Sequence, residues 1–228
     1  MGDTGGRTYA KATIHGRFAG GFGWIAYPGE FMRRSSTALA HDGRVWLVDP
    51  VAMTGIEEEI DALGTVAGVI LTVGWHDRDG RWFADRYRVP LYVPGNLTGA
   101  PSGSPVVRVG GGLPDSPLRL VPCGARGALR HVQECAVWWP DRGVLVTGDS
   151  LGTASYFSDA GALGMHPIRR ASPPVELAGL PVQRLYLGHG TGLVGDDVAG
   201  EVARVIHAAR RELVPGWVRA VRAAATHR

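Results

Sequence analysis

The sequence has almost no lysine, and its basic residues are not clustered. Of its 24 basic residues only Lys11 is a lysine, and the formal net charge is +3. No run of five or six basic residues occurs, and the arginines near the C-terminus are spread at roughly helical intervals. Such a pattern is typical of a solvated helix face, so we expect no nucleic-acid partner. The arginine bias is typical of high-GC codon usage and favours a bacterial source.

Long apolar segments are also absent. No stretch of 18 apolar residues occurs, which argues against a membrane span. The first eleven residues, MGDTGGRTYAK, have no apolar core of the kind found in signal peptides. The two cysteines, Cys123 and Cys135, do not form a CxxC motif and read as a reduced pair. We therefore expect a cytoplasmic protein without a membrane partner.

The composition fits a globular protein with one sizeable core. The chain has 228 residues, of which 45% are hydrophobic and 20% charged. The 34 glycines gather in turns, as expected when short strands are joined by tight loops. We find no internal repeat and no linker, so we expect one domain over residues 1–228. The sequence does not define the oligomeric state, and a homo-oligomer is compatible with it.

Apolar periodicity predicts alternating strands and helices in the first half. Ile56, Ile60 and Leu63 have helical spacing, whereas residues 66–72 form a continuous apolar run typical of a buried strand. The predicted elements are strands at 8–14 and 23–26, a hairpin of 37–40 and 45–48 around His41-Asp42-Gly43, a helix at 55–63, a strand at 66–72, a helix at 79–88 and a strand at 91–93. Residues 96–117 are rich in Gly, Pro and Ser and read as loop.

The second half adds strands and one long helix. Strands are predicted at 118–121, 136–139, 144–147 and 184–187, followed by an amphipathic helix over 198–224 that breaks at Pro215-Gly216. This order of elements predicts a layered α/β sandwich.

Polar residues follow three of the apolar strands. The run ILTVGWHDRD places His76, Asp77 and Arg78 just after one strand, VLVTGD ends in Asp149, and LYLGHG contains His189. His131 precedes another strand. Strand ends that meet at one edge of a sheet fix the loops that carry chemistry, so a site is expected there.

These motifs resemble the metallo-β-lactamase fold superfamily. VWLVDP, VILT with its charged loop, RHVQECAVWWPDRGVLVTGD and LYLGHG follow the order and spacing of that superfamily from about residue 37 to 195. The resemblance implies a four-layer αββα sandwich with one or two metal ions, mostly zinc, at the edge of the sheets. It also implies a ligand loop His-x-His-x-Asp-His, then a later His, an Asp in TGD and a final His in GH.

The ligand loop departs from that pattern. Val73 and Trp75 stand at the first two histidine positions, Arg78 stands at the third, and only Asp77 matches. His76 lies one place out of register, at the variable position. Valine and tryptophan offer no lone pair to zinc, and arginine is permanently cationic.

The remaining ligands favour at most one zinc-like ion. The first metal position keeps only His131 and Asp149, whereas the second keeps Asp77, Asp149 and His189. Three protein ligands and a water form a recognised catalytic zinc arrangement, although the charge of Arg78 opposes an ion there. A dinuclear zinc site is therefore disfavoured, and a site that binds no metal remains an alternative.

A metal-free pocket is the alternative. Arg78 could pair with Asp149 or Asp77 through a forked hydrogen bond and replace the metal as the positive centre. His131, His189 or His76 would then be the general base. In plainer readings, Asp149 only caps a turn and His131 is a structural histidine.

Three other side chains are expected to shape the pocket. Trp75 should fill the space of the lost imidazole or form an apolar wall for a ligand. Tyr156 and His166 lie in the irregular segment between Asp149 and His189, where members of this superfamily often border the pocket.

We therefore predict an enzyme acting on a small molecule, hydrolase-like at an ester, lactone or thioester, with Asp77, Arg78, His76 and His131 as catalytic candidates. The first alternative is a metal-free enzyme for isomerisation, elimination or lactone opening, with Arg78 as the electrophilic or anion-binding group. The second is a non-enzymatic binding protein that keeps only the fold and uses its arginine-rich C-terminal helix for contacts.

Overall fold

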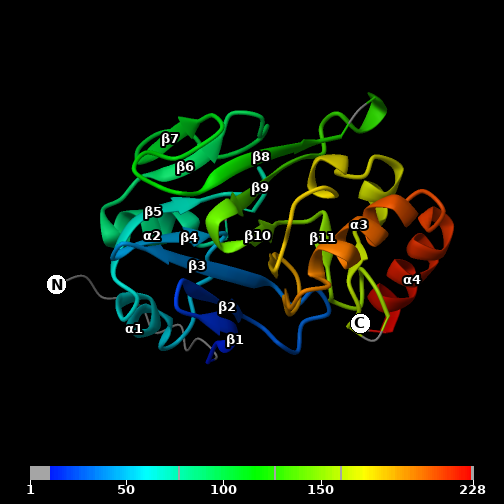
Figure 1. The fold of residues 1–228 in the computed structure, drawn as a ribbon, viewed down its shortest axis with the longest axis horizontal. Helices are drawn as coiled ribbons and strands as arrows, with labels where there is room; N and C mark the ends of the chain where they lie inside the picture. Colours follow the sequence, from blue (N-terminus) through cyan, green and yellow to red (C-terminus); the bar gives the residue numbers. More distant parts are fainter. Residues whose placement is uncertain (1–10, 77, 126, 160, 227–228) are drawn as a thin grey trace.

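Two β-sheets pack face to face between two pairs of helices (Figure 1). The computed structural model describes residues 11–76, 78–125, 127–159 and 161–226. Helices α1 (Ile56–Asp61) and α2 (Gly80–Tyr87) lie on one side of the sheets, and α3 (Val198–Ala208) and α4 (Leu213–Thr226) lie on the other. The predicted four-layer αββα sandwich is confirmed.

The first sheet follows the chain order. Its strands are β1 (Thr13–Phe18), β2 (Gly21–Ile25), β3 (Ser35–His41), β4 (Arg44–Val48), β5 (Thr65–Ile70), β6 (Leu91–Pro94) and β7 (Val106–Val109). Strands β1 to β4 are antiparallel, and β3 and β4 form the predicted hairpin. Strands β4 to β7 are parallel. Helix α1 connects β4 to β5, α2 connects β5 to β6, and a loop connects β6 to β7.

The second sheet has strand order β14-β13-β10-β9-β8. Its strands are β8 (Arg119–Gly124), β9 (Gln133–Trp139), β10 (Val144–Thr147), β13 (Arg184–Leu187) and β14 (Leu193–Val194). Strands β10 and β13 are parallel. A small ribbon of β11 (Leu151–Gly152) and β12 (Gly164–Met165) and the short 3-10 helices η1 (Gly127–Leu129), η2 (Pro140–Arg142), η3 (Pro167–Ala171) and η4 (Val175–Leu177) complete the described elements.

Two hydrophobic clusters hold the layers together. The larger contains Trp46 of the first sheet and Trp139 of the second, and the other packs Trp138 and Leu185 of the second sheet against Val202 of α3. Trp138 and Trp139 point to opposite faces, as expected of neighbours on a strand. Both side chains are buried, because β9 is covered on both faces.

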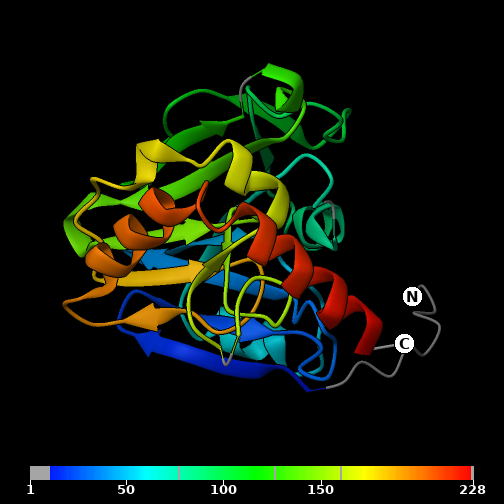
Figure 2. The same cartoon turned by 90° about the vertical axis from the view of Figure 1, so that its right-hand side faces the viewer.

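The structure corrects two predicted segments. The helix predicted over 198–224 is two helices, because α3 ends at Ala208 and α4 begins at Leu213. Pro215 therefore lies in the first turn of α4, where a missing N–H costs little. Figure 2 shows α4 running across one side of the molecule. The loop predicted over 96–117 contains β7 at the edge of the first sheet.

The N-terminal strands are displaced from their predicted positions. Strand β1 begins at Thr13 and β2 at Gly21, so the predicted strand at 8–14 covers only the start of β1. Residues 8–10 of that prediction lie outside the described residues. No helix in the described part of the chain is both long and apolar enough to cross a bilayer.

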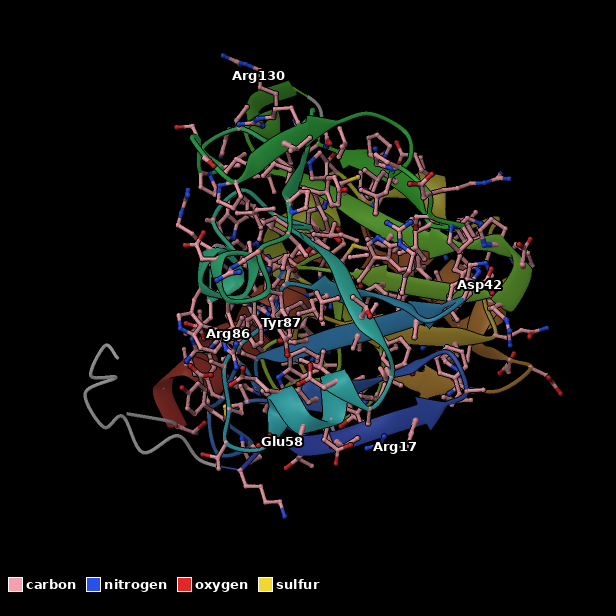
Figure 3. All side chains as sticks on the ribbon, turned by 90° about the vertical axis from the view of Figure 1, so that its left-hand side faces the viewer. Arg17, Asp42, Glu58, Arg86, Tyr87 and Arg130 are labelled. Carbon is pink, nitrogen blue, oxygen red and sulfur yellow. The ribbon has the colours of Figure 1, made fainter. Side chains whose placement is uncertain are left out.

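Surface pairs join the helices over the first sheet. Arg86 Nε of α2 lies 2.9 Å from Glu57 Oε1 of α1, and the Tyr87 hydroxyl donates to Asp61 Oδ1 at 2.9 Å. Figure 3 shows Arg86 and Tyr87 on this surface beside Glu58. Exposed pairs of this kind contribute only about 0–1 kcal/mol each, so burial of apolar residues is the main support of this layer.

Candidate metal site and the adjoining cavity

The loops that follow β4, β5, β10 and β13 meet at one edge of the sandwich. The Ser35 N–H donates to Gly188 O at 2.8 Å, and the Cys135 N–H donates to Thr72 O at 2.8 Å, which ties the two sheets together. Gly188 packs so closely that a Cβ there would lie 2.4 Å from Gly148 O. Gly190 has φ of +92°, which a side chain rarely adopts. Gly188 thus allows the loops after β10 and β13 to approach closely, and Gly190 allows the turn after His189.

His76, Asp149 and His189 form a compact group at this edge, which we name the His–Asp–His cluster. His76 Nε2 lies 2.9 Å from Asp149 Oδ1, and His189 Nε2 lies 3.0 Å from the same oxygen. The ligand atoms all lie within 4.8 Å of one another, and no other group of three or more such residues occurs in the described ranges. In the sequence pattern His76 lies one place away from the ligand positions, whereas in the structure it lies among the potential ligands.

The cluster is held by buried acceptors behind it. Asp49 Oδ2 lies 3.1 Å from His76 Nδ1 and also accepts the Thr72 hydroxyl, while Asp49 Oδ1 accepts the Thr72 N–H at 2.9 Å. Burial opposes the charged form of His76, but attraction and hydrogen bonding to Asp149 and Asp49 outweigh it and raise the pKa of His76 to about 9. Burial likewise opposes ionisation of Asp149, yet His76 and His189 hold its pKa well below the usual value.

His189 has a different protonation pattern. Its Nδ1 lies 2.9 Å from Met32 O, a group that can only accept, and its ring stacks on Phe157 with centroids 5.4 Å apart. Burial lowers the pKa of His189, and Asp149 does not offset this. A neutral His189 has a single proton for two acceptors, Met32 O at Nδ1 and Asp149 Oδ1 at Nε2, so one of these two contacts lacks a proton. Two acceptors in contact repel each other unless a proton or a cation lies between them.

This donor set fits a divalent metal ion. Two imidazole nitrogens and one carboxylate oxygen converge, and each histidine has its other nitrogen held by an acceptor, Asp49 for His76 and Met32 O for His189. Metal-binding histidines nearly always show this outer support, because it fixes the ring and the tautomer. Three protein ligands leave a fourth position open, as in catalytic zinc sites.

Trp75 occupies the outer side of Asp149. Its indole N–H donates to Asp149 Oδ2 at 2.9 Å, while 54% of the residue stays exposed. The indole therefore does not fill the space as a core side chain would, and it forms a wall beside the cluster, which is one of the two roles we expected. Asp149 consequently has Oδ1 turned to the histidines and Oδ2 bonded to the indole.

Arg78 is bound to the backbone. Its Nη1 donates to Ser35 O at 2.5 Å and to Asp49 O at 3.2 Å, and its Nη2 donates to Gly188 O at 3.0 Å. The forked hydrogen bond to Asp149 that we predicted is not formed. The guanidinium thus adds a hydrogen bond to three backbone carbonyls at once, at the start of β3, after β4 and after β13. Arg78 joins the two sheets behind the cluster.

Glu134 is a buried support that the sequence did not reveal. One oxygen accepts the Gly148 N–H at 2.9 Å, and the other accepts the Asp149 N–H at 3.2 Å and both the N–H and hydroxyl of Ser150 at 2.6 Å. Burial raises the pKa of Glu134, against these donors and Arg169. Asp49 was also missed, although its place at the end of the apolar run VWLV was a usable signal.

A cavity of about 260 Å³ adjoins the cluster. Its lining side chains come from the loop after β5, the start of β9 and η3: Val73, Trp75, His131, Val132, Gln133, Glu134, Asp149, His166, Ile168 and Arg169. His131 is exposed and belongs to this wall, not to the His–Asp–His cluster. His166 also lines the cavity, and Tyr156 packs on it with ring centroids 5.2 Å apart.

Asp77, which we predicted as a metal ligand and catalytic residue, lies outside the described residues. Of the predicted metal ligands, the fold brings together Asp149 and His189 and adds His76. Cys123 and Cys135 are both buried and free, which agrees with the reduced pair expected from the sequence.

Comparison with known proteins rests on structure alone, since no family model and no curated protein matches the sequence. The DIM-1 metallo-β-lactamase superposes with a TM-score of 0.61 at 16% identity, over 88% of this chain and 99% of that one. TMB-1 gives 0.62 at 16% identity, over 87% and 98% of the two chains. The FIM-1 metallo-β-lactamase from Pseudomonas aeruginosa, in its mono-zinc form, gives 0.58 at 14% identity, over 89% and 98%. The chain thus has the metallo-β-lactamase fold.

Proposed function

We propose that the protein is a hydrolase of small-molecule esters, lactones or thioesters that uses one divalent metal ion. The ion would be held by His76, Asp149 and His189, whose ligand atoms lie within 4.8 Å of one another. When bound, such an ion supplies Lewis acidity for a carbonyl group and acidity for a water molecule. The convergence of two supported imidazoles on one carboxylate oxygen is the observation that carries this proposal.

The surroundings of the cluster favour one ion over two. Asp149 Oδ2 accepts the Trp75 indole N–H, which would compete with a second ion for this oxygen. The residues that the structure describes contain no second group of three potential metal ligands. A second ion would lack the three or more ligands that stable zinc sites have.

The chain's own residues have separate tasks in this proposal. Asp49 and Met32 O would hold the histidine Nδ1 protons, so that each Nε2 could turn a lone pair to the ion once the ion displaces any proton there. Glu134 holds the turn that presents Asp149. Arg78 holds the strand ends together from behind, because three of its five N–H donors are bonded to backbone carbonyls. This arrangement argues against the metal-free mechanism built on Arg78.

Metal content tests the proposal directly. Chelator-treated protein would be reloaded with Zn²⁺ or Co²⁺ and measured by elemental analysis and by the Co²⁺ absorption spectrum. We expect one equivalent in the native chain, loss of binding in His76→Ala and His189→Ala, and retention in the matched cavity-wall variant His131→Ala. Hydrolysis of a panel of esters, lactones and thioesters should follow metal content. Two bound equivalents, or hydrolysis unchanged without metal, would refute it.

A further inference from the structure

The cavity beside the His–Asp–His cluster has the character of a ligand site. Its volume of about 260 Å³ is roughly nine times the ~30 Å³ that one water molecule occupies in the liquid. That space suits a fragment such as a short acyl chain or one aromatic ring. The aliphatic walls are Val73, Val132 and Ile168, and the Trp75 indole forms a further side. Val73 and Trp75 stand where the aligned pattern has histidines, so those two substitutions create the apolar surface.

The charged side chains of the cavity wall, Glu134, Asp149 and Arg169, make hydrogen bonds to other groups of the protein. Glu134 receives hydrogen bonds from Gly148 to Ser150, as described above. Arg169 is buried and donates to Val132 O at 3.3 Å and to Cys123 O at 2.9 Å. Asp149 carries a negative charge at the boundary with the cluster. An anionic group in this cavity would meet two carboxylates against the single guanidinium of Arg169, whose Nε has no partner in the described part of the chain, so the lining favours a neutral ligand.

His166 offers one hydrogen-bond donor of known tautomer. Its Nδ1 accepts the Ile168 N–H at 3.2 Å, so Nδ1 carries no proton. Burial lowers the pKa of His166 to about 4, which keeps the ring neutral and places its single proton on Nε2. The ring is held between Tyr156 and Phe157, with centroids at 5.2 and 5.7 Å. Its Nε2–H has no acceptor among the described residues.

We propose that the cavity binds the apolar acyl or aryl group of a neutral carbonyl compound and that His166 Nε2–H donates to the carbonyl oxygen. This substrate class rests on the proposed hydrolase for its chemical consequence, because the cavity shares Asp149 with the cluster and would place the carbonyl next to it. Binding itself requires no metal ion, so it can be measured separately.

Unreactive amides are suitable probes. Acetamide, butanamide, hexanamide and benzamide would be titrated into the metal-free full chain by calorimetry, and the His166 ring nitrogens would be followed by ¹⁵N NMR. We expect affinity to rise about fourfold per methylene until the cavity is full. Benzamide should shift the His166 Nε2 signal more than that of exposed His207, which lies on α3.

Four variants separate the contributions of the apolar cavity and of the His166 donor. Ile168→Trp fills the cavity and should weaken hexanamide binding at least tenfold, whereas Val175→Trp, at a position 58% exposed outside the cavity, should leave it unchanged. His166→Phe keeps a ring but removes the donor and should weaken benzamide about fivefold to tenfold. His166→Gln restores an N–H near Nε2 and should recover part of the loss. Circular dichroism would establish that each variant is folded.

The outcomes distinguish this inference from the proposed function. Affinity that does not depend on chain length, or that Ile168→Trp leaves unchanged, refutes the cavity as the binding site. Equal benzamide affinity in His166→Phe and the native chain refutes the donor. In either case one equivalent of Zn²⁺ could still bind and the hydrolase proposal would stand. Amide binding in a chain that takes up no metal would keep this inference and remove the hydrolase.

Discussion

Replacing Asp49 by asparagine tests whether a residue that touches no substrate controls the metal site. Asp49 is 3% exposed and accepts three hydrogen bonds, two from Thr72 and one from His76 Nδ1. Asparagine has one acceptor oxygen, and its NH₂ group would face His76 Nδ1. His76 would then have to accept at Nδ1 and carry its proton on Nε2, the atom needed for the metal.

The structure sets the size of this effect. Two charge-assisted hydrogen bonds to Oδ2 are lost or reversed, and such bonds contribute about 1.5–3 kcal/mol each before the asparagine amide recovers part of the loss. We therefore expect the metal-free protein to lose about 2–4 kcal/mol of unfolding free energy. Loss of an outer-shell partner of a metal-binding histidine weakens metal affinity about 10–100-fold.

Calorimetric titration with Zn²⁺ and urea unfolding would measure the two quantities on the same sample. The matched control is Asp115→Asn, whose side chain is 80% exposed and only contacts Arg44 at 3.4 Å, and it should change neither quantity. Native Zn²⁺ affinity in Asp49→Asn, with the protein folded, would refute the view that Asp49 fixes the His76 tautomer.

Three further predictions concern the buried side chains of Glu134, Arg78 and His15. Glu134→Gln should cost about 2–4 kcal/mol in urea unfolding and lower Zn²⁺ affinity, because four donors from Gly148 to Ser150 lose their carboxylate; native values for both would contradict its supporting role. Arg78→Met should cost about 2–4 kcal/mol by removing three hydrogen bonds that join the two sheets, and a Tm equal to the native one would contradict this. Burial lowers the pKa of His15 from 6.5 to about 4. The contribution of neutral His15 to the free energy of unfolding is therefore complete above pH 6.5, and it falls by at most about 3 kcal/mol as the pH drops toward 4. His15→Gln should flatten this acid limb in unfolding measured from pH 4 to 7, and an unchanged slope would count against it.

Most of the fold could be predicted from local patterns. The apolar run before Thr72, the spacing of Ile56 and Ile60, and the turn between β3 and β4 each depend on a few neighbouring residues, and each was located correctly. The prediction failed where a distant partner decides the conformation. Strand β7 forms in a Gly- and Pro-rich segment because β6 offers it a free edge, and α4 accommodates Pro215 because the chain has already turned after α3.

The sequence by itself determined that Val73, Trp75 and Arg78 offer no imidazole at the places where the ligand loop that it resembles has histidines, since side-chain chemistry needs no coordinates. It also placed Asp149 and His189 at strand ends that share one edge. Only the tertiary structure decided that His76 joins them and that Arg78 turns to the backbone. Those outcomes depend on Asp49, Ser35 and Gly188, which lie 27 to 110 positions along the chain from the residue that each one contacts, His76 or Arg78. Spacing along a chain does not encode such contacts, because the packing of two sheets creates them.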